Sequence, residues 1–172
     1  DGSLHESNTI RRHMAVEELS VGDKAPDFEA TITDGTKVTL SEMLSSGKGV
    51  ILYFYPRDNT PGCTTQACDF RDNIARLSGS GWRVIGVSTD SAKSHQKFID
   101  KYELPYDLIV DEEASLHEAF GTWREKKMYG KTYMGTLRST FAIGSDGRLA
   151  WVGYGVKTKG HVDFLIGELK VE

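Results

Sequence analysis

Apolar and polar residues alternate along this chain in a way that predicts strands and helices in turn. Residues 27–40 read as a β-hairpin, because Asp34-Gly35 lies between two β-prone runs and favours a tight turn. Residues 49–55 are apolar after their glycine, which is typical of a strand covered on both faces. Apolar residues then recur at helical spacing as far as Leu77, so a helix is expected directly after this strand.

The rest of the chain continues the alternation and closes with a hairpin and a helix. Residues 82–88 and 106–110 are predicted as strands, and Ser91 is predicted to cap the helix between them. The remaining predictions are a short helix at 114–120, a polar loop at 123–133, a hairpin around Asp146-Gly147 and a final helix over 159–170. This order predicts an α/β fold of the thioredoxin-like kind, with a central mixed sheet flanked by helices and an N-terminal β-hairpin.

Length and charge limit the classes of function. The 172 residues suffice for one domain with its own core, and residues 15–172 are expected to form it. Residues 1–14 are polar and end in His13-Met14, which resembles a cloning junction, so they are interpreted as a disordered leader. The net charge of −4 is spread over interspersed charges without a basic block, which argues against nucleic-acid binding. The chain contains no run of 18 apolar residues, so no membrane span is expected and a cytoplasmic location is predicted.

The only two cysteines, Cys63 and Cys68, follow the predicted strand of residues 49–55 and have four residues between them. A thiol in the first turn of a helix lies near unpaired amide groups and the positive end of the helix dipole, which favour the nucleophilic thiolate. A second thiol nearby can then capture the oxidised product of the first. Two thiols in a chain of this length do not make a disulfide scaffold, so the pattern predicts thiol-based redox chemistry.

The histidines of the chain do not predict a metal site. A zinc site needs about four ligands, and the two thiols supply only half of them. His95, His117 and His161 are singly placed and lack metal-ligand spacing. His95 and His117 are therefore interpreted as residues at a helix surface or at an edge of the fold.

Pro56, Thr60 and Cys63 form a Pro-x-x-x-Thr-x-x-Cys motif, and a Gly-Cys-Thr-Thr-Gln-Ala-Cys string contains both thiols. Together they closely resemble the peroxiredoxins, specifically the bacterioferritin-comigratory or Q type. The resemblance covers roughly residues 20–170, including the segment 123–135 and the string Arg138-Ser-Thr-Phe. It implies a thioredoxin-like fold and a thiol-dependent peroxidase that reduces hydrogen peroxide and organic hydroperoxides.

The resemblance also implies roles for individual residues. Cys63 would be the peroxidatic cysteine, which becomes a sulfenic acid, and Cys68 the resolving cysteine, which condenses with that acid to form a disulfide. The Thr60 hydroxyl is expected to hydrogen-bond the peroxide while it orients the sulfur. Arg138 is expected to come from an adjacent strand and to donate to both the sulfur and the peroxide oxygens. The substrate pocket is expected to be formed by Pro56, Pro61 and Gly62.

The resemblance implies no metal and no organic cofactor. Electrons would come from thioredoxin, which is regenerated by its NADPH-dependent reductase, or from a similar dithiol reductant. A monomer is predicted, because no long C-terminal extension with a further cysteine follows the domain. Two other functions stay open from the residues alone. One is a thioredoxin-like protein disulfide oxidoreductase, although that class normally carries Cys-x-x-Cys, and the other is a non-catalytic redox sensor or holdase.

Helix geometry makes one further demand on the two cysteines. Residues five apart on a continuous helix are rotated by about 140° and rise by about 7.5 Å. Their Cα atoms then lie beyond the limit of about 7 Å for a disulfide. The first turns of the helix are therefore expected to be folded in the reduced protein and locally unfolded in the oxidised protein.

Overall fold

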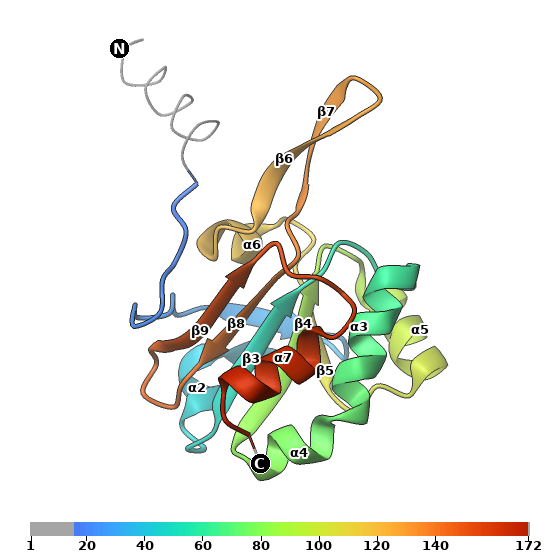
Figure 1. Ribbon diagram of the computed structural model, residues 1–172. Coiled ribbons are helices and arrows are strands. Elements are labelled where there is room, and N and C mark those ends of the chain that lie inside the picture. The colour runs from blue at the N-terminus through green and yellow to red at the C-terminus, as the bar shows by residue number, and fades with distance from the viewer. Residues whose placement is uncertain (1–15, 172) are drawn as a thin grey trace.

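The computed structural model describes residues 16–171, which form a seven-stranded sheet with helices on both faces (Figure 1). The strands of this sheet are β1 (Glu29–Ile32), β2 (Lys37–Thr39), β3 (Gly49–Phe54), β4 (Trp82–Ser88), β5 (Asp107–Val110), β8 (Ser139–Ile143) and β9 (Leu149–Tyr154). Their order is β2-β1-β5-β4-β3-β8-β9. Strands β3, β4 and β5 are parallel neighbours and every other pair in this sheet is antiparallel, which confirms the predicted mixed sheet.

The helices divide between the two faces of the sheet. They are α2 (Leu40–Leu44), α3 (Pro61–Asp72), α4 (Ile74–Gly79), α5 (Ala92–Tyr102), α6 (Ser115–Ala119) and α7 (His161–Glu168). In strand β3, Ile51 and Tyr53 belong to the core under α3, α4, α5 and α7, whereas Val50, Leu52 and Phe54 belong to the core under α2 and α6. Successive side chains of a strand point to opposite faces, so a strand covered on both sides must be apolar throughout. Every residue of β3 is buried, which confirms the prediction of a strand covered on both faces.

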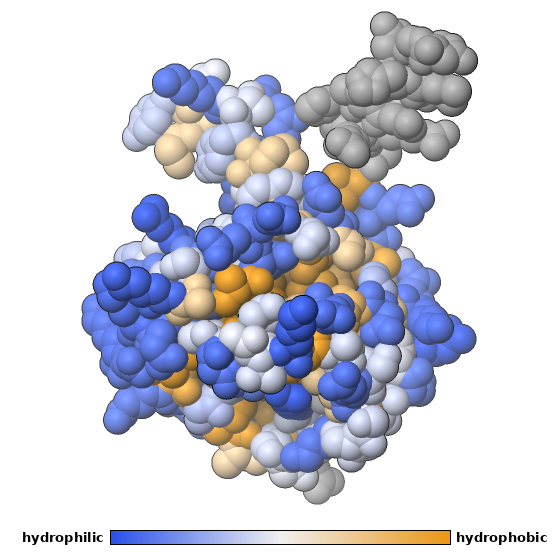
Figure 2. All heavy atoms as spheres, turned by 180° about the vertical axis from the view of Figure 1, so that it is seen from behind, coloured by the Kyte–Doolittle hydropathy of each residue, from blue (hydrophilic) through white to orange (hydrophobic). Residues whose placement is uncertain are grey.

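The segment 123–133 is a β-hairpin, so the prediction of a polar loop there was wrong. Its strands are β6 (Trp123–Met128) and β7 (Lys131–Thr136), which pair with each other in a separate two-stranded sheet. They are joined by Tyr129 and Gly130, whose φ angles of 52° and 74° suit a two-residue hairpin turn. The hairpin projects from the body of the molecule and carries both hydrophilic and apolar side chains (Figures 1 and 2). Most of its side chains are exposed, so its sequence lacks the apolar alternation by which a strand is recognised.

Most other elements agree with the predictions. Both Asp-Gly hairpins are confirmed, as is the helix capped by Ser91, whose side chain accepts a hydrogen bond from the Ser94 amide. The helix expected after β3 divides at Asn73 into α3 and α4, and the short helix α2 was not predicted. The leader expected at residues 1–14 lies outside the described residues. Over residues 16–171, none of the helices has the length and apolar character needed to cross a membrane.

Candidate active site

The loop between β3 and α3 carries the motif that the sequence singled out. Thr60 is the N-cap residue of α3, in an extended conformation with φ −91° and ψ 156°, and Pro61 is the first helical residue. Proline suits that position because its missing N–H would have no acceptor within the helix. Cys63 therefore lies in the first turn of α3, where backbone amides are unpaired. This turn lies beyond the carboxyl end of β3, at the edge of the sheet where α/β proteins commonly bind ligands.

Arg138 joins the Cys63 sulfur to a second side chain of the same helix. It immediately precedes β8, the strand that pairs with β3, as expected. Its Nη2 donates to Cys63 Sγ at 3.3 Å, and its Nη1 donates to Gln66 Oε1 at 2.7 Å. Cys63 and Gln66 are both buried. The planar guanidinium makes both contacts at once, so a permanent positive charge faces the sulfur in the first turn of the helix.

Thr60 precedes Cys63 by three residues, at the N-cap of α3, and its hydroxyl makes a local contact. The hydroxyl donates to the Arg57 carbonyl oxygen at 2.9 Å. A hydroxyl has one proton and two acceptor lone pairs. In this arrangement Thr60 therefore offers a peroxide its lone pairs rather than its proton.

The residues expected to line the pocket differ in exposure. Pro56 is half-buried at the start of the loop, whereas Pro61 is exposed at the first position of the helix. Gly62 is packed closely: a Cβ atom there would lie 3.5 Å from Arg138 Nη2 and 3.1 Å from Thr158 Cγ2. A side chain at position 62 would therefore crowd Thr158, whereas it would meet the guanidinium of Arg138 only at ordinary contact distance.

Cys68 is half-buried in α3, and both thiols are free. In α-helical geometry, Cα atoms five residues apart are separated by about 8.6 Å, which exceeds the span of a disulfide. Both cysteines lie within the continuous helix Pro61–Asp72. The folded helix therefore keeps the two sulfur atoms from forming a bond.

Asp58 anchors the loop before α3 to the body of the protein. Its carboxylate accepts hydrogen bonds from Tyr55 Oη at 2.6 Å and Ser94 Oγ at 2.8 Å, and it contacts His95 Nδ1 at 2.7 Å. Its amide donates to Asp90 Oδ2 at 2.8 Å. Potential metal ligands of Asp58, Asp90 and His95 lie within 4.8 Å of one another, but these hydrogen bonds already engage them. The cluster therefore acts as a structural clamp on the loop.

The prediction that His95 and His117 lie at a helix surface or edge was wrong, because both are fully buried. The second nitrogen of His95 contacts the Ile109 carbonyl oxygen at 2.8 Å. His117 contacts Asp111 Oδ2 at 2.6 Å and Thr136 Oγ1 at 2.9 Å. Polar partners on both ring nitrogens allow an imidazole to lie in the interior without loss of hydrogen bonds.

Two further basic residues lie in the electrostatic field of Arg138. Burial and the charge of Arg138 lower the pKa of His161 to about 4, so its ring is neutral near pH 7. The ring contacts Thr140 Oγ1 at 2.9 Å. Burial and Arg138 also lower the pKa of Lys126, whereas the Cys63 charge acts in the opposite direction. Lys126 is half-buried in β6, a strand of the projecting hairpin.

Sequence reasoning missed Gln66, which accepts a hydrogen bond from Arg138, and Asp58, which anchors the loop before α3. Gln66 follows Cys63 by three residues, which places both on one face of a helix, and that spacing was an available signal. Asp58 depends on His95, which lies 37 residues away, so no local pattern could reveal the pair.

Comparison with known proteins gives one consistent result. The family model described as AhpC/TSA matches residues 21–152. Peroxiredoxin Bcp of Bacillus subtilis is 48% identical over 152 residues, which cover 88% of this chain and 96% of that protein. Peroxiredoxin Bcp of Escherichia coli is 41% identical over 152 residues, with the same coverage of each.

Solved structures agree with the sequence relatives. A cysteine-to-serine mutant of Xylella fastidiosa PrxQ superimposes with a TM-score of 0.83 at 34% identity, covering 90% of this chain and 97% of that one. The Xanthomonas campestris bacterioferritin comigratory protein, described for its alkyl peroxide reduction activity, gives a TM-score of 0.80 at 36% identity. That match covers 88% of this chain and 96% of the other.

Proposed function

The chain belongs to the AhpC/TSA family as a peroxiredoxin of the Bcp/PrxQ type, and from this premise we propose that Cys63 is the peroxidatic and Cys68 the resolving cysteine of a thiol peroxidase. The observation that carries the proposal is the 3.3 Å hydrogen bond from Arg138 Nη2 to the Cys63 sulfur in the first turn of α3. A buried thiol with this cation beside it is suited to attack an electrophile, whereas a structural thiol needs no such partner.

In the first step, the Cys63 thiolate attacks the terminal oxygen of a hydroperoxide. The S–O bond forms as the O–O bond breaks, the alkoxide takes a proton and leaves as an alcohol, and the sulfur becomes a sulfenic acid. Arg138 donates to the reacting atoms and Thr60 accepts from the peroxide hydroxyl. Holding the peroxide in line and stabilising the leaving oxygen supply most of the acceleration, because a more acidic thiol is also a weaker nucleophile.

In the second step, the Cys68 thiolate attacks the Cys63 sulfur. The S–S bond forms, the S–O bond breaks, and hydroxide leaves as water after it takes a proton. The spacing of the two cysteines on a continuous helix requires α3 to unwind locally before this bond forms. A dithiol reductant then returns both cysteines to the thiol state.

Three finer assignments belong to the same proposal. The substrates include alkyl hydroperoxides, by analogy with the Xanthomonas campestris relative. The electron donor is thioredoxin or a similar dithiol protein, since the disulfide product requires two electrons and two protons. The enzyme acts as a monomer in the cytoplasm, a compartment in which thiols stay reduced.

Intact-mass analysis of the reduced protein, mixed with one equivalent of hydrogen peroxide and quenched over seconds, tests the two roles. The parent is expected to lose about 2 Da, and Cys68→Ser to gain about 16 Da as a sulfenic acid. Cys63→Ser is expected not to react on this timescale. If both thiols of the parent stay reduced, the assignment is wrong and disulfide exchange with proteins becomes the working hypothesis.

A further inference from the structure

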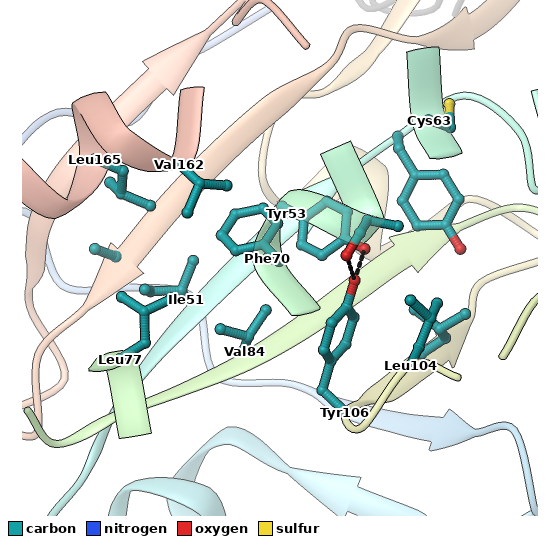
Figure 3. Packing of buried hydrophobic residues seen from close by; sticks show 14 of the residues in the cluster. Ile51, Tyr53, Cys63, Phe70, Leu77, Val84, Leu104, Tyr106, Val162 and Leu165 are labelled. Atoms are coloured by element: carbon teal, nitrogen blue, oxygen red, sulfur yellow. Dashed lines mark hydrogen bonds between the residues drawn. The ribbon is translucent and has the colours of Figure 1, made fainter. Parts of the chain in front are cut away.

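A chain of buried hydrogen bonds ends on the backbone of α3 between the two cysteines. The hydroxyls of Tyr53 and Tyr106 lie 2.8 Å apart, and the Tyr106 hydroxyl donates to the Ala67 carbonyl oxygen at 2.8 Å. Figure 3 shows the Tyr106 hydroxyl directed from below at these oxygens, with Cys63 farther along the same helix. The Tyr53 ring stacks on Phe70 of α3 with 4.6 Å between ring centroids, which holds its hydroxyl in place.

The direction of each hydrogen bond in this chain is determined. Burial raises the pKa of Tyr106 and raises that of Tyr53 well above its ordinary value, so both hydroxyls keep their protons. The single proton of Tyr106 is donated to the Ala67 carbonyl oxygen. The Tyr53 proton must therefore be donated to the Tyr106 oxygen. Both protons have an acceptor only while the Ala67 carbonyl is in its present position.

Ala67 lies within the segment that must change shape when the disulfide forms. It immediately precedes Cys68 and is four residues after Cys63, in the helix whose geometry keeps the two sulfur atoms apart. Unwinding that brings Cys68 to Cys63 moves the Ala67 carbonyl away from Tyr106. One hydroxyl proton of the tyrosine pair is then buried without an acceptor, which is unfavourable.

We propose that Tyr106 is a positioning residue that holds α3 in its folded form and thereby sets the rate of disulfide closure. The inference rests on the proposed roles of Cys63 and Cys68. The Tyr106 hydroxyl donates its proton to the Ala67 carbonyl oxygen, and it acts on α3 through this bond. It therefore lengthens the lifetime of the Cys63 sulfenic acid without changing the step that produces it.

A longer-lived sulfenic acid has a chemical consequence. Its deprotonated form can attack a second hydroperoxide: another S–O bond forms, the O–O bond breaks, and an alcohol leaves after taking a proton. The product is a sulfinic acid, which cannot be captured by Cys68. The Tyr106 hydroxyl therefore makes the enzyme more sensitive to inactivation by excess peroxide.

Rapid-quench mass analysis of Tyr106→Phe tests the inference, with hydrogen peroxide as the probe. Sulfenic acid formation is expected to stay within about twofold of the parent. Closure to the disulfide is expected to be about tenfold faster, equivalent to about 1.4 kcal/mol for the lost hydrogen bond. The fraction that reaches the sulfinic acid in excess peroxide is expected to fall by about the same factor.

Two control variants separate this effect from general loss of stability. Tyr154→Phe removes a hydroxyl that donates to the Phe120 carbonyl oxygen at 2.7 Å, and this half-buried side chain packs against the core on the opposite face of the sheet. Tyr53→Phe keeps the bond between Tyr106 and Ala67. Both controls are expected to close the disulfide at the parent rate. If Tyr106→Phe does not fold, the double variant Tyr53→Phe/Tyr106→Phe carries the test, because it leaves neither tyrosine hydroxyl without a partner.

The outcomes are distinct. Closure in Tyr106→Phe within twofold of the parent, or equal acceleration in Tyr154→Phe, would overturn the inference. Slower formation of the sulfenic acid in Tyr106→Phe would also overturn it, because Tyr106 would then act on the peroxide step. A parent that forms no disulfide would overturn the proposed function itself, and the missing loss of about 2 Da reveals that case directly.

Discussion

The neutral imidazole of His161 makes the stability of the protein depend on pH. His161 is the first residue of α7 and is buried against Thr140, and its ring lies 5.8 Å from that of Trp151 between centroids. Burial and the charge of Arg138 lower its pKa from 6.5 to about 4. Protonation of this ring is therefore easier in the unfolded chain than in the folded protein.

The sign and size of the effect follow from this difference. A base whose pKa is lowered by folding contributes stability that is complete above its unfolded pKa and is lost as the pH falls. Here the loss begins near pH 6.5 and is complete below about pH 4, where it reaches about 3 kcal/mol. Between pH 7.5 and pH 5 it amounts to about 2 kcal/mol. That is a substantial part of the typical 5–15 kcal/mol for a domain.

Urea unfolding of the reduced parent and of His161→Gln, measured from pH 7.5 to pH 5, tests this value. Glutamine can keep a hydrogen bond to Thr140 but does not titrate. Between pH 7.5 and pH 5, the parent is expected to lose about 2 kcal/mol of unfolding free energy relative to the variant. Carboxylates common to both proteins cancel in this difference. Parallel loss of stability in the two proteins over this range would refute the reasoning.

Three further outcomes are expected. Arg138→Lys should slow the peroxide step by about 10²-fold or more in stopped-flow assays. The reason is that one ammonium cannot bond Gln66 and the Cys63 sulfur together in the geometry of the guanidinium. An unchanged rate would show that Arg138 has no part in the mechanism. Asp58→Asn should lower the free energy of unfolding by about 2–4 kcal/mol in urea titrations, because it breaks the buried contact with His95. A change below about 0.5 kcal/mol would show that the Asp58 cluster contributes little to stability. Partial burial and neighbouring carboxylates raise the pKa of Asp69, so its ionised form is unfavourable in the folded state. Asp69→Asn should therefore raise the free energy of unfolding at pH 7 by a few tenths of a kcal/mol, because solvent screens much of the repulsion. The gain should vanish below the unfolded pKa of 3.8, and a gain that persists there would contradict the electrostatic cause.

Much of the main sheet was predictable because its signals are local. A strand covered on both faces must be apolar at every position, which identified β3, and Asp-Gly turns identified both hairpins. The projecting hairpin β6–β7 carried no such signal, because exposed strands need no apolar face. The break at Asn73 was also missed, since apolar spacing continues from α3 into α4.

The sequence by itself determined the reactive element of this protein: a thiol in the first turn of a helix, directly after a buried strand, with a second thiol five positions later. These are properties of neighbouring residues, and neighbouring residues set local geometry. Only the tertiary structure decided what surrounds that element. Arg138 meets the sulfur from 75 residues away, and Tyr106 reaches the helix backbone from 39 residues away. Such contacts depend on which strands lie side by side and which side chains become buried together, and a pattern along one segment of chain does not contain that information.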